Sequence, residues 1–388
     1  MPLHREIAVE VAPVLGELRE NRPVCPITLV TGAPAMLVTR HEDIKTILSD
    51  RRFSRAAVCK EDAPKTTLVP PNPDTLVNMD PPRHGSIRRI AAQAFTPKRL
   101  ERLMPRIGEI AADLVDAMVA AGKPVDLNEM FSRPLPLRVI CDMLGVPFAD
   151  WALFHEWTEV ILNVHASPQD IGAAYVAMRA YFVNLITTKR DDPGDDFLSE
   201  LGTASAEGGP LTEQEAIAVA TFVFVAGHET SATLLTAGVL SLLRHPDQLK
   251  ELLADPELWV GAADEINRVG IPGLSPFPRI ALTDLTLQDV EIPAGTAVVA
   301  NYEAGLRDPR VYPEPEKFDI HRRHPNPLWF GHGPHFCLGA PVARAELYLG
   351  LRELFERLPT LALDMPIDDL KWRNTATLGG FEQFPVTW

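Results

Sequence analysis

Apolar positions recur with helical spacing over most of the chain, and they alternate with strand spacing mainly near its two ends. The alternation predicts short strands at 27–32 and 35–40, around a Gly-Ala-Pro turn, and further strands within 285–300 and 381–388. Amphipathic patterns predict the surface helices at 41–50, 99–121, 133–145 and 150–190. The pattern therefore predicts a mainly α protein with small β-sheets.

One segment, residues 213–243, is apolar on nearly every face, which predicts a buried helix. Thr212 and Glu215 form a capping box at its start. At 1.5 Å per residue this helix would be roughly 45 Å long. A membrane span is the rival interpretation, but His228 and Glu229 near the centre favour a helix buried in protein.

Length and composition set limits on the class of protein. The 388 residues contain no flexible linker, so we expect a single domain spanning 1–388. Residues 1–20 have neither the apolar core of a signal peptide nor a membrane anchor, so we expect no membrane association. The formal net charge of −15 argues against nucleic acid as a partner. Four scattered cysteines fit a reducing, cytoplasmic compartment.

Residues 55–80 form a long, proline-rich loop, and such loops in compact proteins tend to be functional. A helix is predicted to begin near Pro82, with Asp80 as its cap. His84 and Arg88 lie four residues apart on this helix, so they can bind an anion together. That spacing alone is weak evidence.

Cys337 lies in a glycine-rich turn, Phe330 to Gly339, just ahead of an alanine-rich helical segment. The start of a helix offers unpaired N–H groups and a positive dipole end, which lower the pKa of a thiol. Gly331 and Gly333 permit backbone angles closed to other residues. Gly339 removes a side chain where a flat group would press against the helix. A planar metal complex bound through sulfur fits these features.

The residues around Cys337 leave two other interpretations open. A lone thiol is usually a buried structural cysteine. A zinc site is the second alternative, because His332 and His335 are close in sequence. Their spacing does not match the usual paired ligands, and no second ligand pair is evident.

A second polar group, Ala226 to Ser231, lies in the middle of the long helix. Burying Glu229 there is costly unless it has partners or a task. Gly227 weakens the helix, and Thr230 can hydrogen-bond back to the carbonyl of Ala226, which permits a local bend. Such a helix can hold water or a diatomic ligand beside a cofactor. The alternative is a satisfied structural network of polar groups.

Taken together, these motifs resemble the cytochrome P450 family of heme-thiolate monooxygenases, of the soluble bacterial type. The resemblance covers nearly the whole chain and keeps the family's order. It matches the 226–230 segment to the oxygen-activating helix, and Glu265 and Arg268 to the Glu-x-x-Arg pair, with Arg322 completing that network. The chain departs from the family pattern at Asn267, at Gly305-Leu306 before Arg-Asp-Pro, and at Pro276-Phe277-Pro278, which puts details of packing and pocket shape in doubt.

The resemblance implies the P450 fold, in which a long central helix lies over a heme. It places a β-containing part at about 1–55, a helical core at about 82–270 and the heme-binding loop at 330–339. Cys337 would be the axial ligand of the iron of heme b. The implied cofactor-binding residues are His84, Arg88, Ala226, Arg279, Phe330, His335, Cys337 and Gly339.

The implied activity uses O2 as co-substrate. Thr230 would hydrogen-bond the oxygen being activated, and Glu229, with water, would supply protons. Electrons would come from NAD(P)H through external partners, ferredoxin and its reductase, because no flavin or iron–sulfur motif appears in the chain. Basic residues form a candidate docking patch or are ordinary solvated charges; they are Arg89, Lys98, Arg99 and Arg323. We expect a monomer.

The implied reaction is hydroxylation or epoxidation of a mid-sized hydrophobic molecule, in bacterial secondary metabolism. The candidate substrate walls are mostly apolar segments at 56–80, 160–165, 221–226, 275–277 and 378–381. The alternatives are oxidative coupling, rearrangement or desaturation on the same heme, or a heme-binding protein without turnover. The pair Glu229–Thr230 favours an enzyme, since binding alone needs no proton relay.

Overall fold

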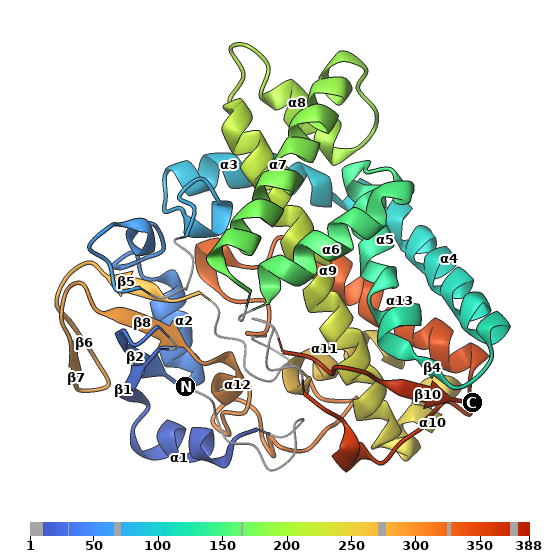
Figure 1. Ribbon diagram of the computed structural model, residues 1–388. Coiled ribbons are helices and arrows are strands. Elements are labelled where there is room, and N and C mark those ends of the chain that lie inside the picture. Colours follow the sequence, from blue (N-terminus) through green and yellow to red (C-terminus); the bar gives the residue numbers. More distant parts are fainter. Residues whose placement is uncertain are drawn as a thin grey trace. The chain divides into compact units, whose positions relative to one another are not determined.

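The structure, a computed structural model, describes residues 11–29, 31–65, 71–163, 166–270, 277–323, 327–372 and 379–388 (Figure 1). The chain divides into two compact units. The first comprises Met1–Gly85, Asn267–Phe318 and Arg323–Cys337, and the second comprises Ser86–Ile266, Asp319–Arg322 and Leu338–Trp388. The single domain inferred from the sequence remains a prediction.

The first unit is built around a five-stranded sheet of order β1-β2-β8-β5-β3. Its elements are α1 (Pro13–Asn21), β1 (Val24–Thr28), β2 (Pro34–Val38), α2 (His41–Ser49), β3 (Phe53–Ser54), η1 (Ala56–Cys59), η2 (Leu76–Asn78), β5 (Arg279–Ala281), β6 (Leu285–Leu287), β7 (Val290–Ile292), β8 (Ala297–Ala300), α12 (Tyr302–Gly305) and η6 (Gly333–His335). β1 and β2 are antiparallel, with Val24 opposite Val38, whereas β2 and β8 are parallel. Leu37, Ile280 and Val299 pack together in its core.

The predicted strands are confirmed with shifted bounds. The first pair begins three and one residues earlier than predicted, because Val24 and Cys25 are buried while Leu29 only packs against the edge of the core. The alternating segment 285–300 forms β6, β7 and β8.

The second unit is mainly helical, with a small sheet of order β4-β10-β9. Its elements are η3 (Ala92–Phe95), α4 (Pro97–Ala121), β4 (Val125–Asp126), the π-helical turn η4 (Asn128–Ser132), α5 (Pro134–Leu144), η5 (Phe148–Asp150), α6 (Trp151–Leu162), α7 (Pro168–Asp191), α8 (Phe197–Ala204), α9 (Glu213–Leu243), α10 (Pro246–Ala254), α13 (Ala340–Arg357), β9 (Ala362–Leu363), η7 (Ile367–Asp369) and β10 (Pro385–Thr387). Two helices, α3 (Arg83–Ala91) and α11 (Leu258–Val269), include residues of both units.

The buried helix predicted at 213–243 is confirmed as α9, with the capping box of Thr212 and Glu215 in place. It packs against α5, α7 and α13, and Figure 1 shows it running through the helical unit. By length and composition alone α9 would be long and apolar enough to cross a membrane, but 61% of its most apolar window is buried inside the protein. It is therefore a core helix, which explains its apolar residues without a membrane.

Two local predictions were wrong. The segment 150–190 forms two helices, α6 and α7, because Ser167 caps a new helix by accepting from the amide of Asp170 at 3.0 Å, with Pro168 in its first turn. Asp80 does not cap α3 with its carboxylate as predicted. That group accepts from the hydroxyl of Ser54 and, at 2.9 Å, from the amide of Arg55.

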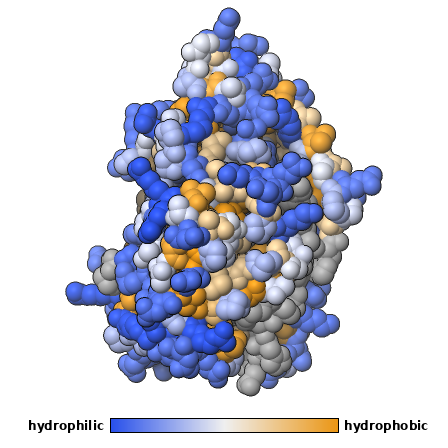
Figure 2. Space-filling view, turned by 90° about the vertical axis from the view of Figure 1, so that its left-hand side faces the viewer, coloured by the Kyte–Doolittle hydropathy of each residue, from blue (hydrophilic) through white to orange (hydrophobic). Residues whose placement is uncertain are grey.

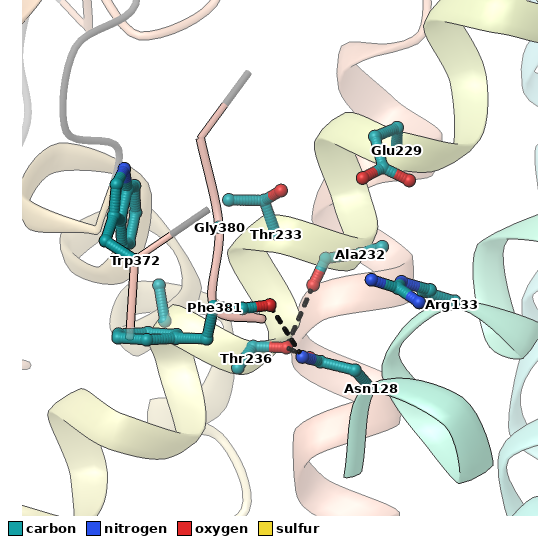
Figure 3. Close-up of a pocket in the computed structure, with 10 residues that line it drawn as sticks. Asn128, Arg133, Glu229, Ala232, Thr233, Thr236, Trp372, Gly380 and Phe381 are labelled. Carbon is teal, nitrogen blue, oxygen red and sulfur yellow. Dashed lines mark hydrogen bonds between the residues drawn. The ribbon is translucent and has the colours of Figure 1, made fainter. Parts of the chain in front are cut away.

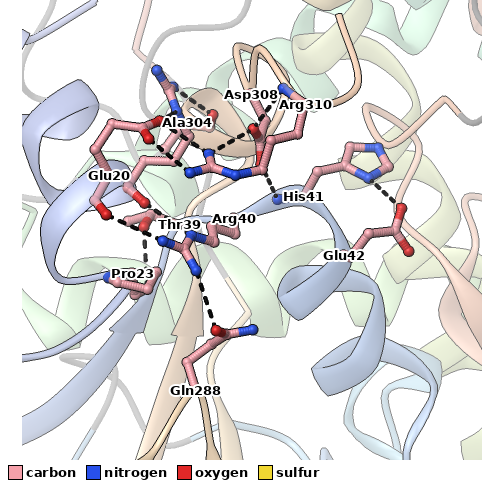
Figure 4. A network of polar contacts seen from close by, with 11 residues as sticks. Glu20, Pro23, Thr39, Arg40, His41, Glu42, Gln288, Ala304, Asp308 and Arg310 are labelled. Atoms are coloured by element: carbon pink, nitrogen blue, oxygen red, sulfur yellow. Dashed lines mark hydrogen bonds and ion pairs between the residues drawn. The ribbon is translucent and has the colours of Figure 1, made fainter.

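The first unit anchors its N-terminal helix through a network of ions (Figure 4). Arg310 donates to both carboxylate oxygens of Glu20, at 3.0 and 2.7 Å, and also to Asp308 at 3.1 Å. Asp308, which is 1% exposed, accepts from the amide of His41 at 3.1 Å. Burial raises the pKa of Asp308, but the amide donors of Arg310 and His41 outweigh it and lower the pKa overall.

The second unit buries an acid between two helices. Glu346 of α13 is 1% exposed, and Ser231 of α9 hydrogen-bonds its carboxyl group. Burial raises the pKa of Glu346 to about 8, because desolvation disfavours the charged form more than Ser231 stabilises it. Hydrophilic residues cover much of the face shown in Figure 2, with apolar residues visible between them.

We predict that Asp308→Asn lowers the free energy of unfolding by about 1–3 kcal/mol at pH 7, because the new amide group faces the donors of His41 and Arg310. The folded-state pKa of Asp308 lies below its ordinary value, so its contribution is present above that value and is lost as the pH falls through the folded value. Denaturant titrations at neutral and acidic pH measure both effects. Asp62→Asn, at an exposed position of the same unit, is the control. An equal loss at both pH values would contradict this account.

For Glu346 we predict a pH dependence of the unfolding free energy opposite to that of Asp308. Its folded-state pKa is raised, so the free energy of unfolding is highest below the unfolded pKa and falls as the pH rises from about 4.5 to about 8. Glu346→Gln is neutral throughout, and we expect it to remove a decline of about 1.4 kcal/mol per pH unit in that window. The measurement is the difference in unfolding free energy between variant and parent from pH 5 to pH 8. Glu353→Gln, on the same helix and partly exposed, should leave the slope unchanged.

Candidate active site

The turn around Cys337 has the backbone that its glycines predicted. Gly331 and Gly333 have φ values of +79° and +70°, in the left-handed region that favours glycine. A side chain at Gly333 would also approach the carbonyl oxygen of Leu48 to 3.0 Å. The amide of Cys337 donates to the carbonyl of Phe330 at 2.8 Å and closes the turn.

The Cys337 thiol is exposed and in no disulfide, and α13 begins three residues later at Ala340. The buried structural cysteine considered above is therefore excluded for this residue. Cys141 shows the contrast, since its thiol is buried and burial raises its pKa to about 12. An exposed thiol near the start of a helix is suited to metal ligation as a thiolate.

The roles predicted for Phe330 and Gly339, two neighbours of Cys337, remain predictions. Phe330 is 9% exposed, with its ring centroid 6.3 Å from that of Phe336 in an edge contact. Gly339 has an ordinary φ of −83°, and a side chain there would meet only the ring of Phe95 at 3.8 Å. The backbone therefore does not require glycine at position 339. Space for a flat group remains as the explanation for a glycine there.

His84 and His335 are brought together in the first unit, although they are far apart in sequence. Their ring centroids are 4.2 Å apart, with the planes tilted by 40°, and His84 is 2% exposed. Arg88 lies one helical turn after His84 on α3, and its side chain is half-buried. Both residues are thus held on a regular helix, as the sequence predicted.

Arg279, on β5 of the first unit, is a buried cation with no ion pair to any described residue. It is 5% exposed, donates to the carbonyl of Phe53 at 3.2 Å, and its Nε atom has no hydrogen-bond partner among the described residues. Burial lowers its pKa, because the charged form is poorly solvated. A buried guanidinium with an unused donor fits a carboxylate ligand, which a propionate of heme would supply.

A second buried guanidinium nearby, that of Arg55, was not identified from the sequence. Burial, followed by repulsion from Arg279, lowers the pKa of Arg55 to about 10. The phenol of Tyr302 shares this environment: burial raises its pKa to about 12, although Arg279 and Arg55 oppose that shift. In sequence Arg55 looks like its neighbours Arg51 and Arg52, so only burial distinguishes it. The excess positive charge strengthens the fit to an anionic cofactor.

On α9, the second unit presents an alcohol and an acid side by side in sequence. The hydroxyl of Thr230 donates to the carbonyl of Ala226 at 3.0 Å, as predicted. Ala226 is exposed and Thr230 half-buried, whereas Glu229 is 3% exposed. The helix is continuous here, and Gly227 has a packing role: a side chain on it would approach Ile140 of α5 to 2.9 Å.

Glu229 lines a small pocket beside α9, and Thr230 is not among the residues that line it (Figure 3). Consecutive helical residues point about 100° apart, so the acid and the alcohol have different surroundings. Thr236 donates to the side-chain oxygen of Asn128 at 2.7 Å, and Asn128 donates to the carbonyl of Phe381 at 3.1 Å. Arg133 also lines this pocket, with its guanidinium on the same side as the Glu229 carboxylate. No sequence pattern identified Asn128 or Arg133.

The structural network expected around Glu265 is confirmed for Arg322. Glu265 is fully buried and accepts from Arg322 at 3.2 Å and from the amide of Asp319 at 2.9 Å. In the first unit, Arg268 donates to the carbonyls of Leu306 and Lys317, at 3.2 and 3.0 Å. Arg268 thus binds backbone carbonyls and Arg322 binds a buried acid, contacts that fit the structural roles expected of them.

One member of the candidate docking patch, Arg99, forms ion pairs within its own unit. Arg99 pairs with Glu200 at 2.6 Å and with Asp195 at 3.4 Å, so its charge is neutralised within the second unit. Arg89 and Lys98 are exposed. Among the described residues, no group of three or more His, Cys, Asp or Glu side chains is placed to hold a metal ion.

The predicted substrate walls are described in part. Their residues 66–70, 164–165, 275–276 and 378 lie outside the described residues. In the first unit Phe277 is 47% exposed. In the second unit Gly380 and Phe381 line the pocket that contains Glu229.

Comparison with known proteins places these features in one family. The cytochrome P450 family profile matches residues 23–150 and 140–364. The mycinamicin IV hydroxylase/epoxidase of Micromonospora griseorubida is 40% identical over 379 residues, covering 96% of this chain and 94% of that protein. The nocardicin C N-oxygenase of Nocardia uniformis subsp. tsuyamanensis is 37% identical over 390 residues, covering 100% and 98%.

Among solved structures, the putative thioether synthase of griseoviridin tailoring superposes with a TM-score of 0.95 at 38% identity, covering 100% of this chain and 99% of that one. The family uses heme and O2 and receives its electrons from other proteins. The chain belongs to the cytochrome P450 family and is a monooxygenase of that family.

Proposed function

We propose that the thiolate of Cys337 ligates the iron of heme b and that the heme propionates are bound by His84, Arg88, Arg279 and His335. The observation that carries this proposal is the exposed thiol of Cys337, held by a turn with two left-handed glycines at the start of α13. The unused Nε donor of buried Arg279 supports the propionate assignment. Ala226, Phe330 and Gly339 complete the proposed set as the surfaces against which the ring packs.

A heme ligated by thiolate supplies reductive activation of O2, since the sulfur donates electron density that favours O–O cleavage. The chain's own part is to deliver protons and exclude water. Thr230 already donates its proton to Ala226, so its hydroxyl oxygen is left as an acceptor that can hold a water molecule. Glu229, from the neighbouring face of α9, is proposed to pass protons to that water.

We infer that the electrons come from NAD(P)H through a ferredoxin and its reductase. Exposed Arg89 and Lys98 support a docking surface for an acidic electron carrier. The protein is proposed to act as a cytoplasmic monomer, in keeping with four cysteines that include no disulfide.

The substrate is proposed to be a mid-sized hydrophobic molecule that is hydroxylated or epoxidised in bacterial secondary metabolism. The apolar, partly exposed ring of Phe277 supports an apolar ligand. Relatives that act on antibiotic intermediates support the same class.

A second candidate reaction is oxidative bond formation, such as coupling, rearrangement or desaturation, on the same heme. The structural similarity to a putative thioether synthase, with a TM-score of 0.95, supports this second candidate reaction. Product analysis separates the two, because only hydroxylation and epoxidation transfer an atom of labelled O2 to the product.

The heme assignment predicts that the reduced, CO-treated protein has the Soret band of thiolate ligation. Cys337→Ser should abolish that band, because an alcohol does not replace the thiolate. Cys59→Ser should leave it intact, since Cys59 is a partly buried thiol in a different part of the first unit. Absorption spectra of the three proteins measure this. A colourless parent protein would overturn the proposal.

The proton-delivery assignment predicts that Thr230→Ala diverts reducing equivalents to hydrogen peroxide. Proton transfer by a positioned group is worth roughly 10²–10⁴ in rate, so we expect the peroxide released per NADH consumed to rise by roughly tenfold. Thr230→Ser retains the hydroxyl and should stay near the parent value. Peroxide and NADH are measured with a ferredoxin and reductase supplied. An unchanged ratio in Thr230→Ala would refute the role of Thr230.

A further inference from the structure

Arg55 holds two segments of the first unit that are far apart in sequence. It directly follows β3 and is only 4% exposed. Its Nε donates to the carbonyl of Val77 at 3.0 Å, its Nη2 donates to the side-chain oxygen of Asn78 at 2.6 Å, and its Nη1 donates to the carbonyl of Pro278. One guanidinium thus anchors η2 and the residue that leads into β5.

The surroundings of Arg55 fix its place. Its own amide is bound by the carboxylate of Asp80 at 2.9 Å. Its guanidinium carbon lies 5.4 Å from the ring centroid of Phe277, in a cation–π contact. Asn78 extends the anchor by donating to the carbonyl of Asn72 at 2.9 Å. Both ends of the arrangement belong to segments that the sequence identified as candidate substrate walls.

The same group adjoins the proposed cofactor edge. Pro278, which accepts from Arg55, directly precedes Arg279. Asn72 to Asn78 contains only short 3-10 structure, with few backbone hydrogen bonds of its own. A buried side chain that donates to several carbonyls is therefore a major restraint on this segment.

We propose that Arg55 is a positioning residue that joins the 76–80 and 277–279 segments into one substrate-facing wall, held in register with Arg279 at the edge of the heme. This inference rests on the proposed function. The three hydrogen bonds use the forked geometry of a guanidinium, which a lysine ammonium does not reproduce.

The test compares Arg55→Lys and Arg55→Met with Arg52→Met. Arg52 is a matched control, since its side chain is 57% exposed and binds only Asp50 among the described residues. Two probes that ligate ferric heme iron are titrated by absorption: imidazole, which is too small to reach far from the iron, and 4-phenylimidazole, whose ring extends toward the walls. The ratio of the two dissociation constants measures the effect of the wall on binding, because changes at the heme iron affect both probes alike.

We expect both Arg55 variants to weaken the binding of 4-phenylimidazole by roughly tenfold relative to that of imidazole. Binding of the larger ligand must then also restrain a wall that has lost its hydrogen bonds to Arg55. Arg52→Met should keep the parent ratio. Amide hydrogen exchange provides a second readout: residues 76–80 and 279–281 should exchange faster in the Arg55 variants, while α9 keeps its protection.

An unchanged ligand ratio together with unchanged exchange at 76–80 would overturn the inference. So would faster exchange spread over both units, because it indicates a general loss of stability. If Arg55→Met does not accumulate as folded protein, Arg55→Lys, which keeps the charge, decides the outcome. Failure of the proposed function is distinguishable, since the parent protein would then lack the thiolate Soret band and bind neither probe.

Discussion

A buried positive charge must be compensated, and the first unit buries the guanidinium groups of Arg55 and Arg279 in one region. The guanidinium of Arg55 donates to neutral carbonyl and amide oxygens, and the Nε donor of Arg279 has no partner among the described residues. Such an arrangement is costly in the protein alone and becomes favourable when a carboxylate binds. The same residues bind the backbone of the surrounding loops, so the proposed anion site and these loops share their supporting contacts.

The second unit places an acid and an alcohol next to each other on its central helix, α9, which is largely buried. Because Thr230 and Glu229 are consecutive in α9, they face different environments: Thr230 bonds within its own helix, and Glu229 faces the pocket with Asn128 and Arg133. Close approach of α5 at Gly227 keeps that helix rigidly placed.

Features encoded in a few neighbouring residues could be predicted from the sequence. The capping box at Thr212 and the left-handed glycines of the Cys337 turn appear where their local chemistry requires them. The errors also have local causes. At Ser167 a new helix cap outweighed the continuing apolar periodicity, and the carboxylate of Asp80 accepts from Ser54 and Arg55, which are distant in sequence. The burial of a single charged side chain has no local sequence pattern, unlike that of an apolar helix, and for that reason Arg55 was missed.

The sequence by itself determined the helical character, the glycine-rich turn around Cys337 and the order of the motifs, because each depends on residues close together along the chain. Tertiary structure alone decided which charged groups are buried. Glu346 and Arg55 resemble ordinary surface residues in the sequence, yet their ionisation differs because folding removes their water. Desolvation is a property of everything packed around a group, and that set of neighbours is drawn from distant parts of the chain.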